Sequence, residues 1–136
     1  MEAYKWGLEQ DWIQTIGFSK IAVPQAWLED FSDDQGIKEA RHMAYDYLKE
    51  HNLLLKPIHC LGQGDPTEFA YYDHPMMRST DSVYPVFAAW LGQDFSKDHT
   101  TRTPTPHNFL ETFDMSDVTP ELITSNVEFL INQARK

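Results

Sequence analysis

The sequence is poor in cysteine and in basic residues, and it has no long apolar run. Its 136 residues include one cysteine, Cys60, and 11 Lys or Arg against 21 Asp or Glu. A single cysteine excludes an internal disulfide and is typical of a reducing compartment. No run approaches the roughly 20 apolar residues that span a bilayer, and the first twelve residues lack the basic and apolar blocks of a signal peptide. We therefore expect a cytoplasmic protein with no membrane partner.

Motifs that hold metals, nucleotides or catalytic groups are also lacking. No CxxC or HxxxH spacing occurs, and Gly62-Gln63-Gly64 has neither a third glycine nor a predicted helix behind it. His59 and Cys60 are adjacent, so on a strand they would point to opposite faces and could not readily act together. A Cys/His-dependent enzyme or metal site that adds His74, His99 or His107 is our third interpretation, because a buried structural thiol is far commoner. We expect no enzyme, no catalytic residues, no metal and no cofactor.

The negative charge is spread along the whole chain. The formal net charge is −10, with −4 in residues 1–56, −3 in residues 57–92 and −3 in residues 93–136. Hydrophobic residues make up 41% of the chain, which is enough for the core of a single domain over residues 1–136. A surface with this charge repels nucleic acid and favours a protein partner with a basic surface.

Ser32–His51 carries the clearest helical pattern. Ser32, Asp33 and Asp34 can accept hydrogen bonds from the first N–H groups of a helix, and no proline follows before Pro57. One side of the helix is apolar and predicts core: Ile37, Ala40, Ala44, Tyr47 and Leu48. A second strip is basic and could lie against phosphates: Lys38, Arg41, His42, Tyr45 and Lys49. The alternative is an ordinary solvated helix face.

The other elements predict a mainly helical α+β fold. A stripe at Tyr4, Leu8, Trp12 and Ile16 predicts a helix over residues 3–16, followed by a short strand at 18–23 and a helix from Pro24. Residues 53–61 and 69–73 flank the turn-rich segment 62–68 and predict an antiparallel hairpin. Further helices are expected at 83–91, from Thr105-Pro106, and from Thr119-Pro120 to the chain end. The apolar side of Leu122–Ala134 could cover its own domain or a second copy in a homodimer.

The order helix, strand, helix, long helix and hairpin resembles a winged helix-turn-helix domain over residues 2–74, with residues 75–136 as a helical extension. This resemblance implies that the long helix enters the DNA major groove with Lys38, Arg41, His42, Tyr45 and Lys49. One feature departs from it. The wing at residues 63–68 carries Asp65 and Glu68 and no Lys or Arg, so it would repel a phosphate.

Glu29, Asp30, Asp33 and Asp34 form the densest acidic cluster. It could imitate nucleic-acid phosphates and occupy the basic groove of a DNA- or RNA-handling enzyme, or it could merely cap the long helix. The four tryptophans, Trp6, Trp12, Trp27 and Trp90, are expected in the core, and an exposed one would instead mark a binding hot spot.

The sequence therefore predicts a non-enzymatic acidic protein that binds another protein, as an inhibitor or immunity-type partner of a nucleic-acid-processing complex. The alternative is a winged-helix transcription regulator that binds DNA. These two hypotheses place the working surface on different residues, the acidic cluster in the first and the basic strip in the second.

Overall fold

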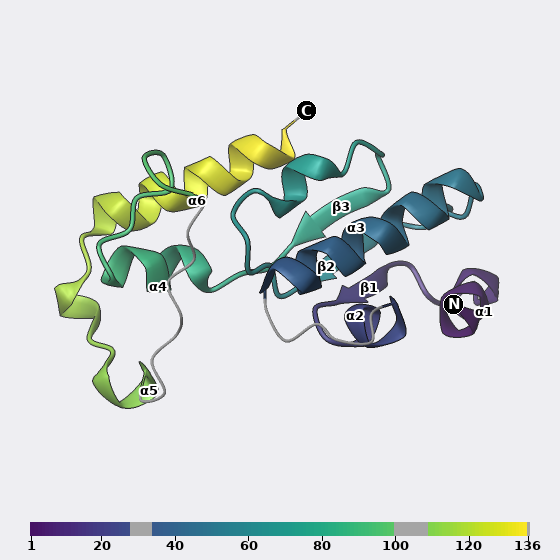
Figure 1. Ribbon diagram of the computed structural model, residues 1–136, viewed down its shortest axis with the longest axis horizontal. Coiled ribbons are helices and arrows are strands. Elements are labelled where there is room, and N and C mark those ends of the chain that lie inside the picture. Colours follow the sequence, from purple (N-terminus) through teal and green to yellow (C-terminus); the bar gives the residue numbers. More distant parts are fainter. Residues whose placement is uncertain (28–33, 100–108, 136) are drawn as a thin grey trace. The chain divides into compact units, whose positions relative to one another are not determined.

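The computed structural model describes residues 1–27, 34–99 and 109–135. The chain divides into two compact units, whose helices and strands are labelled in Figure 1. The N-terminal unit comprises residues 1–63 and 71–81, and the C-terminal unit comprises residues 64–70 and 82–136. No described helix combines the length and the apolar character needed to cross a bilayer.

The N-terminal unit consists of three helices and a small sheet. In chain order its elements are α1 (Glu2–Glu9), β1 (Ile16–Ser19), α2 (Ala22–Trp27), α3 (Asp34–Glu50), β2 (Ile58–Leu61) and β3 (Met77–Thr80). The 3₁₀ helix η1 (Glu68–Tyr71) precedes β3 in the chain, and its residues 68–70 belong to the C-terminal unit. The core of the N-terminal unit combines apolar residues of α3, such as Ala40, Ala44 and Leu48, with Phe18, Ile58 and Cys60 from the strands. The predicted helix at Ser32–His51 is thus confirmed over Asp34–Glu50.

All three strands run parallel, in the order β1-β2-β3. Ile16 pairs with Ile58 at the start of β1, and His59 pairs with Ser79 after a bulge that leaves Arg78 as the extra residue. Ile58 and Cys60 are buried while His59 and Leu61 are more exposed, so β2 has one covered and one open face.

The predicted antiparallel hairpin is wrong. Residues 68–71 form the 3₁₀ helix, and the strand that pairs with β2 begins later, at Met77. Two local features cause this: Gly62 turns the chain with a φ of 72°, and the Asp65 carboxylate accepts hydrogen bonds from the N–H and hydroxyl of Thr67, both at 2.7 Å. The connection becomes long enough for a parallel crossover. The described residues therefore form no antiparallel wing, and nothing in their arrangement identifies a winged helix.

The first helix is shorter than predicted, and the strand after it begins earlier. α1 ends at Glu9 and β1 covers Ile16–Ser19, where we expected a helix over 3–16 and a strand over 18–23. The Lys56 ammonium donates to the carbonyl oxygens of Gly7 at 2.9 Å and Gln10 at 2.7 Å. A cation at the carbonyl end of a helix satisfies acceptors that would otherwise bond the next turn. Lys56, distant in sequence, thus helps to end α1.

The C-terminal unit is helical. It contains α4 (Tyr84–Trp90), α5 (Phe109–Thr112), the 3₁₀ helix η2 (Met115–Asp117) and α6 (Pro120–Ala134). Tyr84, Phe87, Ala88 and Phe95 form its core, against which Trp90, Phe129 and Leu130 pack. Pro85 and Pro120 lie in the first turns of α4 and α6, as predicted, because a proline there removes no helical hydrogen bond. The mainly helical α+β class is confirmed.

Asn126 provides the buried polar link in this core. Its carboxamide oxygen accepts from the Phe95 N–H at 2.8 Å, and its nitrogen donates to the carbonyl oxygens of Gln93 at 3.0 Å and Pro85 at 3.3 Å. Asn126 has no exposed surface, so water cannot replace these bonds.

We predict that Asn126→Ala lowers the free energy of unfolding by about 2–3 kcal/mol, because it leaves buried backbone groups without partners. Denaturant unfolding followed by circular dichroism measures this. The exposed Asn132 on the same helix is the control, and its alanine variant should change stability by less than about 0.5 kcal/mol. Equal effects of the two substitutions would contradict the assignment.

Candidate functional site

Arg41 lies inside the N-terminal unit, where we expected an exposed basic strip. Its side chain is fully buried, and Nη1 donates to the carbonyl oxygens of Phe18 at 3.4 Å and Leu61 at 3.1 Å. These carbonyls lie near the ends of β1 and β2, so the guanidinium joins α3 to both strands. Tyr45 is also buried. The expectation of an exposed strip is therefore wrong at both positions.

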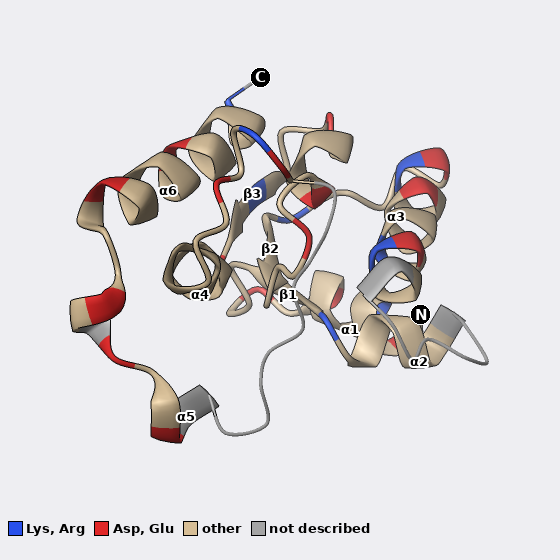
Figure 2. Cartoon of the chain, turned by 60° about the vertical axis from the view of Figure 1, so that its left-hand side comes forward, with Lys and Arg blue, Asp and Glu red and all other residues tan. Residues whose placement is uncertain are grey.

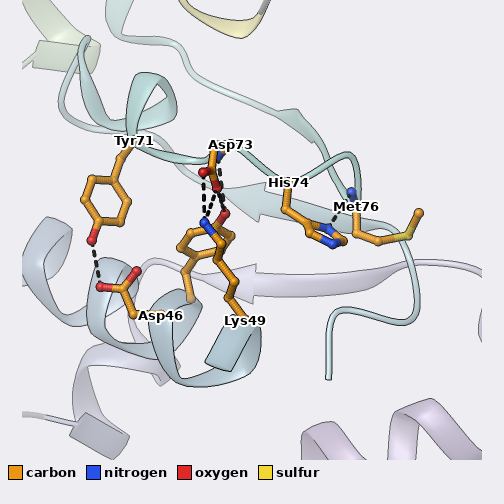
Figure 3. A network of polar contacts seen from close by, with 7 residues as sticks. Asp46, Lys49, Tyr71, Asp73, His74 and Met76 are labelled. Atoms are coloured by element: carbon orange, nitrogen blue, oxygen red, sulfur yellow. Dashed lines mark hydrogen bonds and ion pairs between the residues drawn. The ribbon is translucent and has the colours of Figure 1, made fainter. Parts of the chain in front are cut away.

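Lys49 and Tyr45 both bind Asp73, which follows η1 (Figure 3). The Lys49 ammonium lies 2.8 Å from each carboxylate oxygen, and the Tyr45 hydroxyl donates to Oδ1. These two donors, Lys49 first, lower the pKa of Asp73 to about 2. Burial, together with the Asp73 carboxylate, raises the pKa of Tyr45 well above its ordinary value. The cation of Lys49 is thus engaged within the chain.

His42 and Asp46, also on α3, contact Tyr71, which lies two residues before Asp73 in the chain. The His42 ring stacks on Tyr71 with a centroid distance of 3.8 Å and an interplanar angle of 11°. The Tyr71 hydroxyl donates to Asp46 Oδ2 at 2.6 Å, and this bond raises the pKa of Tyr71 (Figure 3). Of the five residues expected to contact phosphates, four therefore hold α3 against the strands or against residues 71–73, and the fifth, Lys38, is half-buried.

We predict that Tyr45→Phe raises the pKa of Asp73 from about 2 toward the ordinary aspartate value, because one stabilising donor is lost. The stabilising effect of Asp73 is present above its unfolded-state pKa and disappears as pH falls through the folded-state value. In Tyr45→Phe the folded-state pKa of Asp73 lies closer to its unfolded-state pKa. The pH range over which the contribution of Asp73 to stability is lost should therefore be narrower. NMR titration of the Asp73 carboxyl carbon measures the shift. Tyr71→Phe is the control, since Tyr71 binds Asp46, and an equal shift in both variants would contradict the assignment.

The acidic cluster expected to bind a partner falls mostly outside the described residues. Glu29, Asp30 and Asp33 lie there, and Asp34 begins α3 without a described side chain. A partner-binding role for this cluster therefore stays a prediction.

Trp6 and Trp12 lie on the surface of the N-terminal unit, where we expected core. Their exposed fractions are 53% and 71%, and their rings meet edge to face with centroids 6.1 Å apart. The physical reason is the early end of α1: a continuous helix would have placed Trp12 above Leu8 on the buried stripe, but the chain turns after Glu9. The exposed acids Glu9 and Asp11 lie between the two tryptophans in sequence, and the exposed Lys5 precedes Trp6.

The position of this pair is fixed by contacts of α1. The Tyr4 hydroxyl donates to the carbonyl oxygen of Leu53 at 2.9 Å, and burial raises its pKa to about 12. The Lys56 ammonium binds the other end of the helix. Trp6 therefore projects from a helix that is anchored at both ends.

The C-terminal unit carries a run of exposed acids along α5 and α6 that the sequence did not single out. Residues 103–134 contain no Lys or Arg. Within the described part, the exposed acids are Glu111, Asp114, Asp117, Glu121 and Glu128, which we call the α5–α6 acidic surface. Figure 2 shows red segments along α5 and α6 with no blue between them. Val127 and Ile131, one turn apart on α6, are 38% and 41% exposed, so apolar and acidic groups share this helix.

His59 binds Ser79 and Asp81 rather than acting with Cys60. Its Nδ1 lies 2.7 Å from Ser79 Oγ, and its Nε2 lies 3.2 Å from Asp81 Oδ1. The Gly62 N–H also donates to Asp81 Oδ1 at 2.9 Å, and these bonds, with that of Gly62 first, lower the pKa of Asp81. Cys60 is buried, as expected for a neighbour on a strand. The sequence could not reveal this trio, because nothing in residues 77–80 predicted a strand.

No three His, Cys, Asp or Glu side chains of the described residues converge on a position that could hold a metal ion. Comparison with protein-family models, curated proteins and solved structures found no match. The functional interpretation therefore depends on the chain's own residues.

Proposed function

We propose that the protein acts by binding another protein through an aromatic and acidic surface that matches a basic partner. The observation that carries this proposal is the exposed pair Trp6 and Trp12, with the exposed acids Glu9 and Asp11 between them in sequence. Leaving two indole rings in water forgoes the favourable free energy of burial, which for a large side chain is about 2–3 kcal/mol. Binding a partner would recover it.

The composition of this surface matches that of a protein-binding hot spot. Tryptophan is enriched among the residues that dominate binding energy, and such residues are surrounded by a polar rim that excludes water. We propose that Glu9 and Asp11 supply an acidic rim, which complements Lys or Arg of the partner and disfavours nucleic acid. The anchoring of α1 by Tyr4 and Lys56 reduces the entropy lost when a partner binds.

The overall charge supports the same class of partner. Each unit carries five more acidic than basic side chains, counted over residues 1–63 with 71–81 and over the remainder. Fields of one sign steer a basic partner toward the protein and raise its association rate at low salt. A nucleic-acid-processing complex, whose own substrate is polyanionic, presents such a basic surface. We propose that the protein inhibits or protects against a complex of this kind.

The cations of α3 give the DNA-binding alternative little support. Arg41 and Lys49 already bind carbonyl and carboxylate oxygens of this chain. We expect no salt-dependent binding to random duplex DNA at low ionic strength, where phosphate contacts are strongest. Binding that weakens steeply with salt and is lost in Lys38→Ala would favour the regulator instead.

The proposal predicts that Trp6→Ala with Trp12→Ala weakens binding at least about 30-fold, the equivalent of about 2 kcal/mol. Co-purification from source cells identifies the partner, and titration calorimetry then measures its affinity. Leu55→Ala with Val83→Ala is the matched control, since it also removes two exposed apolar side chains. If the control variant weakens binding as much as the tryptophan variant, the Trp6–Trp12 surface is not the site.

Charge-reversal variants distinguish the effect of the acidic rim on association from the effect of the net charge. We predict that Glu9→Lys with Asp11→Lys slows association and reduces its dependence on salt, because two carboxylates beside the aromatic pair are replaced. Glu50→Lys with Glu39→Lys makes the same change in net charge on α3 and should have a smaller effect. A four-residue reversal of Glu111, Asp114, Asp117 and Glu121 tests the α5–α6 acidic surface in the same assay. Association rates that respond only to net charge would contradict a localised rim.

The mass of the protein in solution tests the remaining alternative, a homodimer through Leu122–Ala134. Val127 and Ile131 are exposed apolar residues of that helix. If they do not contact a second copy of the chain, the measured mass should be that of a monomer. A dimer that dissociates in Val127→Glu would assign this surface to a second copy.

A further inference from the structure

We propose that Ser79 is a reactive nucleophile, activated by His59 and Asp81, that accepts an acyl group from an activated ester. Ser79 and Asp81 are each hydrogen-bonded to one ring nitrogen of His59. Ser79 and His59 lie on the open face of the sheet, and Asp81 lies at its end. Serine, histidine and carboxylate in this order are the arrangement that converts a weakly nucleophilic hydroxyl into an attacking group. This inference is independent of the proposed binding function.

The strand pairing sets the geometry of the trio. Ser79 on β3 and His59 on β2 are paired directly across the parallel ladder, so their side chains leave the sheet on the same face. Asp81 follows the end of β3, and the Gly62 N–H holds its carboxylate beside His59 Nε2. The bulge at Arg78 produces this register: without the extra residue, His59 would pair with Arg78.

The solvent exposure of the three side chains suits a nucleophile that must contact a reagent. Ser79 is exposed, while the His59 side chain keeps 29% of its surface and the Asp81 side chain keeps 63%. The imidazole is thus partly shielded while the hydroxyl it contacts is open. Cys60, the other nucleophile of this strand, is buried on the opposite side.

A backbone donor follows the nucleophile. The N–H of Asp81 donates to the carbonyl oxygen of Cys60, so the N–H groups of β3 alternate between β2 and the outer edge. By this alternation the Thr80 N–H points to the outer edge, where the sheet of the described residues has no further strand. An N–H on the residue after a nucleophile is a common donor to the oxyanion of acyl transfer.

The reaction is a transfer of an acyl group from an ester to Ser79. Ser79 Oγ attacks the carbonyl carbon, and His59 Nδ1 takes the hydroxyl proton while its Nε2–H stays bound to Asp81. The bond to the leaving alkoxide or aryloxide breaks, and His59 returns the proton to that oxygen. The products are the Ser79 ester and the free alcohol or phenol, so no oxidation or further reactant is involved.

The chain contains a matched internal control. Ser96 is an exposed serine whose hydroxyl donates to the Asp94 carboxylate at 2.6 Å, and no histidine of the described residues is hydrogen-bonded to it. Both serines therefore have a carboxylate nearby, and the imidazole distinguishes them.

The test is acetylation of the full chain by p-nitrophenyl acetate, followed by peptide mass spectrometry. We expect Ser79 to be acetylated about 100-fold faster than Ser96, the lower range for a positioned general base. His59→Ala should reduce the rate at Ser79 to that of Ser96, and added imidazole should restore part of it. Equal rates at Ser79 and Ser96 in the wild-type protein would overturn the proposal.

Asp81→Asn provides the second variant in case His59→Ala fails to fold. The asparagine oxygen can still accept from the Gly62 N–H, so the turn is kept while the charge beside His59 is removed. We expect a lower acetylation rate at Ser79 with an unchanged circular dichroism spectrum. An unchanged rate in Asp81→Asn, together with an unchanged rate in a folded His59→Ala, would assign the trio to strand stability alone.

Discussion

The bonds between the Arg41 guanidinium and the backbone of β1 and β2 set the arrangement of the N-terminal unit. A fully buried cation is costly unless it is paired, and two strand carbonyls accept hydrogen bonds from Nη1 of Arg41 here. Because Arg41 fixes the rotation of α3 on the sheet, Tyr45 is buried and both Tyr45 and the exposed Lys49 contact Asp73. Four residues of the predicted DNA-binding strip are thereby engaged inside the unit. These contacts give little support to a DNA-binding role for α3.

Local signals predicted the parts of the fold that depend on local physics. Prolines in the first turns located α4 and α6, and the apolar spacing with no proline located α3. The hairpin was wrong because strand pairing depends on contacts distant in sequence. A turn-rich segment is compatible with a tight antiparallel turn or with a crossover, and the Asp65–Thr67 bonds and the φ of Gly62 select the crossover. Neither the parallel sheet nor β3 could be predicted from residue preferences.

The candidate sites depend on the same non-local contacts. Trp12 continues the apolar spacing of α1, so a helix running to Ile16 would bury it; the turn after Glu9, supported by Lys56, exposes it instead. His59 was predicted to point away from Cys60, and the burial of Cys60 agrees, but its pairing with Ser79 required knowledge of β3. Acidity was readable from composition alone. The distribution of acidic residues over the folded surface could not be predicted from composition, because it depends on which residues lie outside the core.

The stability of Arg41→Ala measured beside its binding to duplex DNA tests this account most directly. If the guanidinium joins α3 to the sheet, the substitution lowers the free energy of unfolding by about 3 kcal/mol, because buried carbonyls lose charged donors. Lys38→Ala on the same helix should cost less than about 1 kcal/mol. Neither variant should change duplex binding. The account would be contradicted if Arg41→Ala kept wild-type stability while it abolished a salt-dependent affinity for DNA.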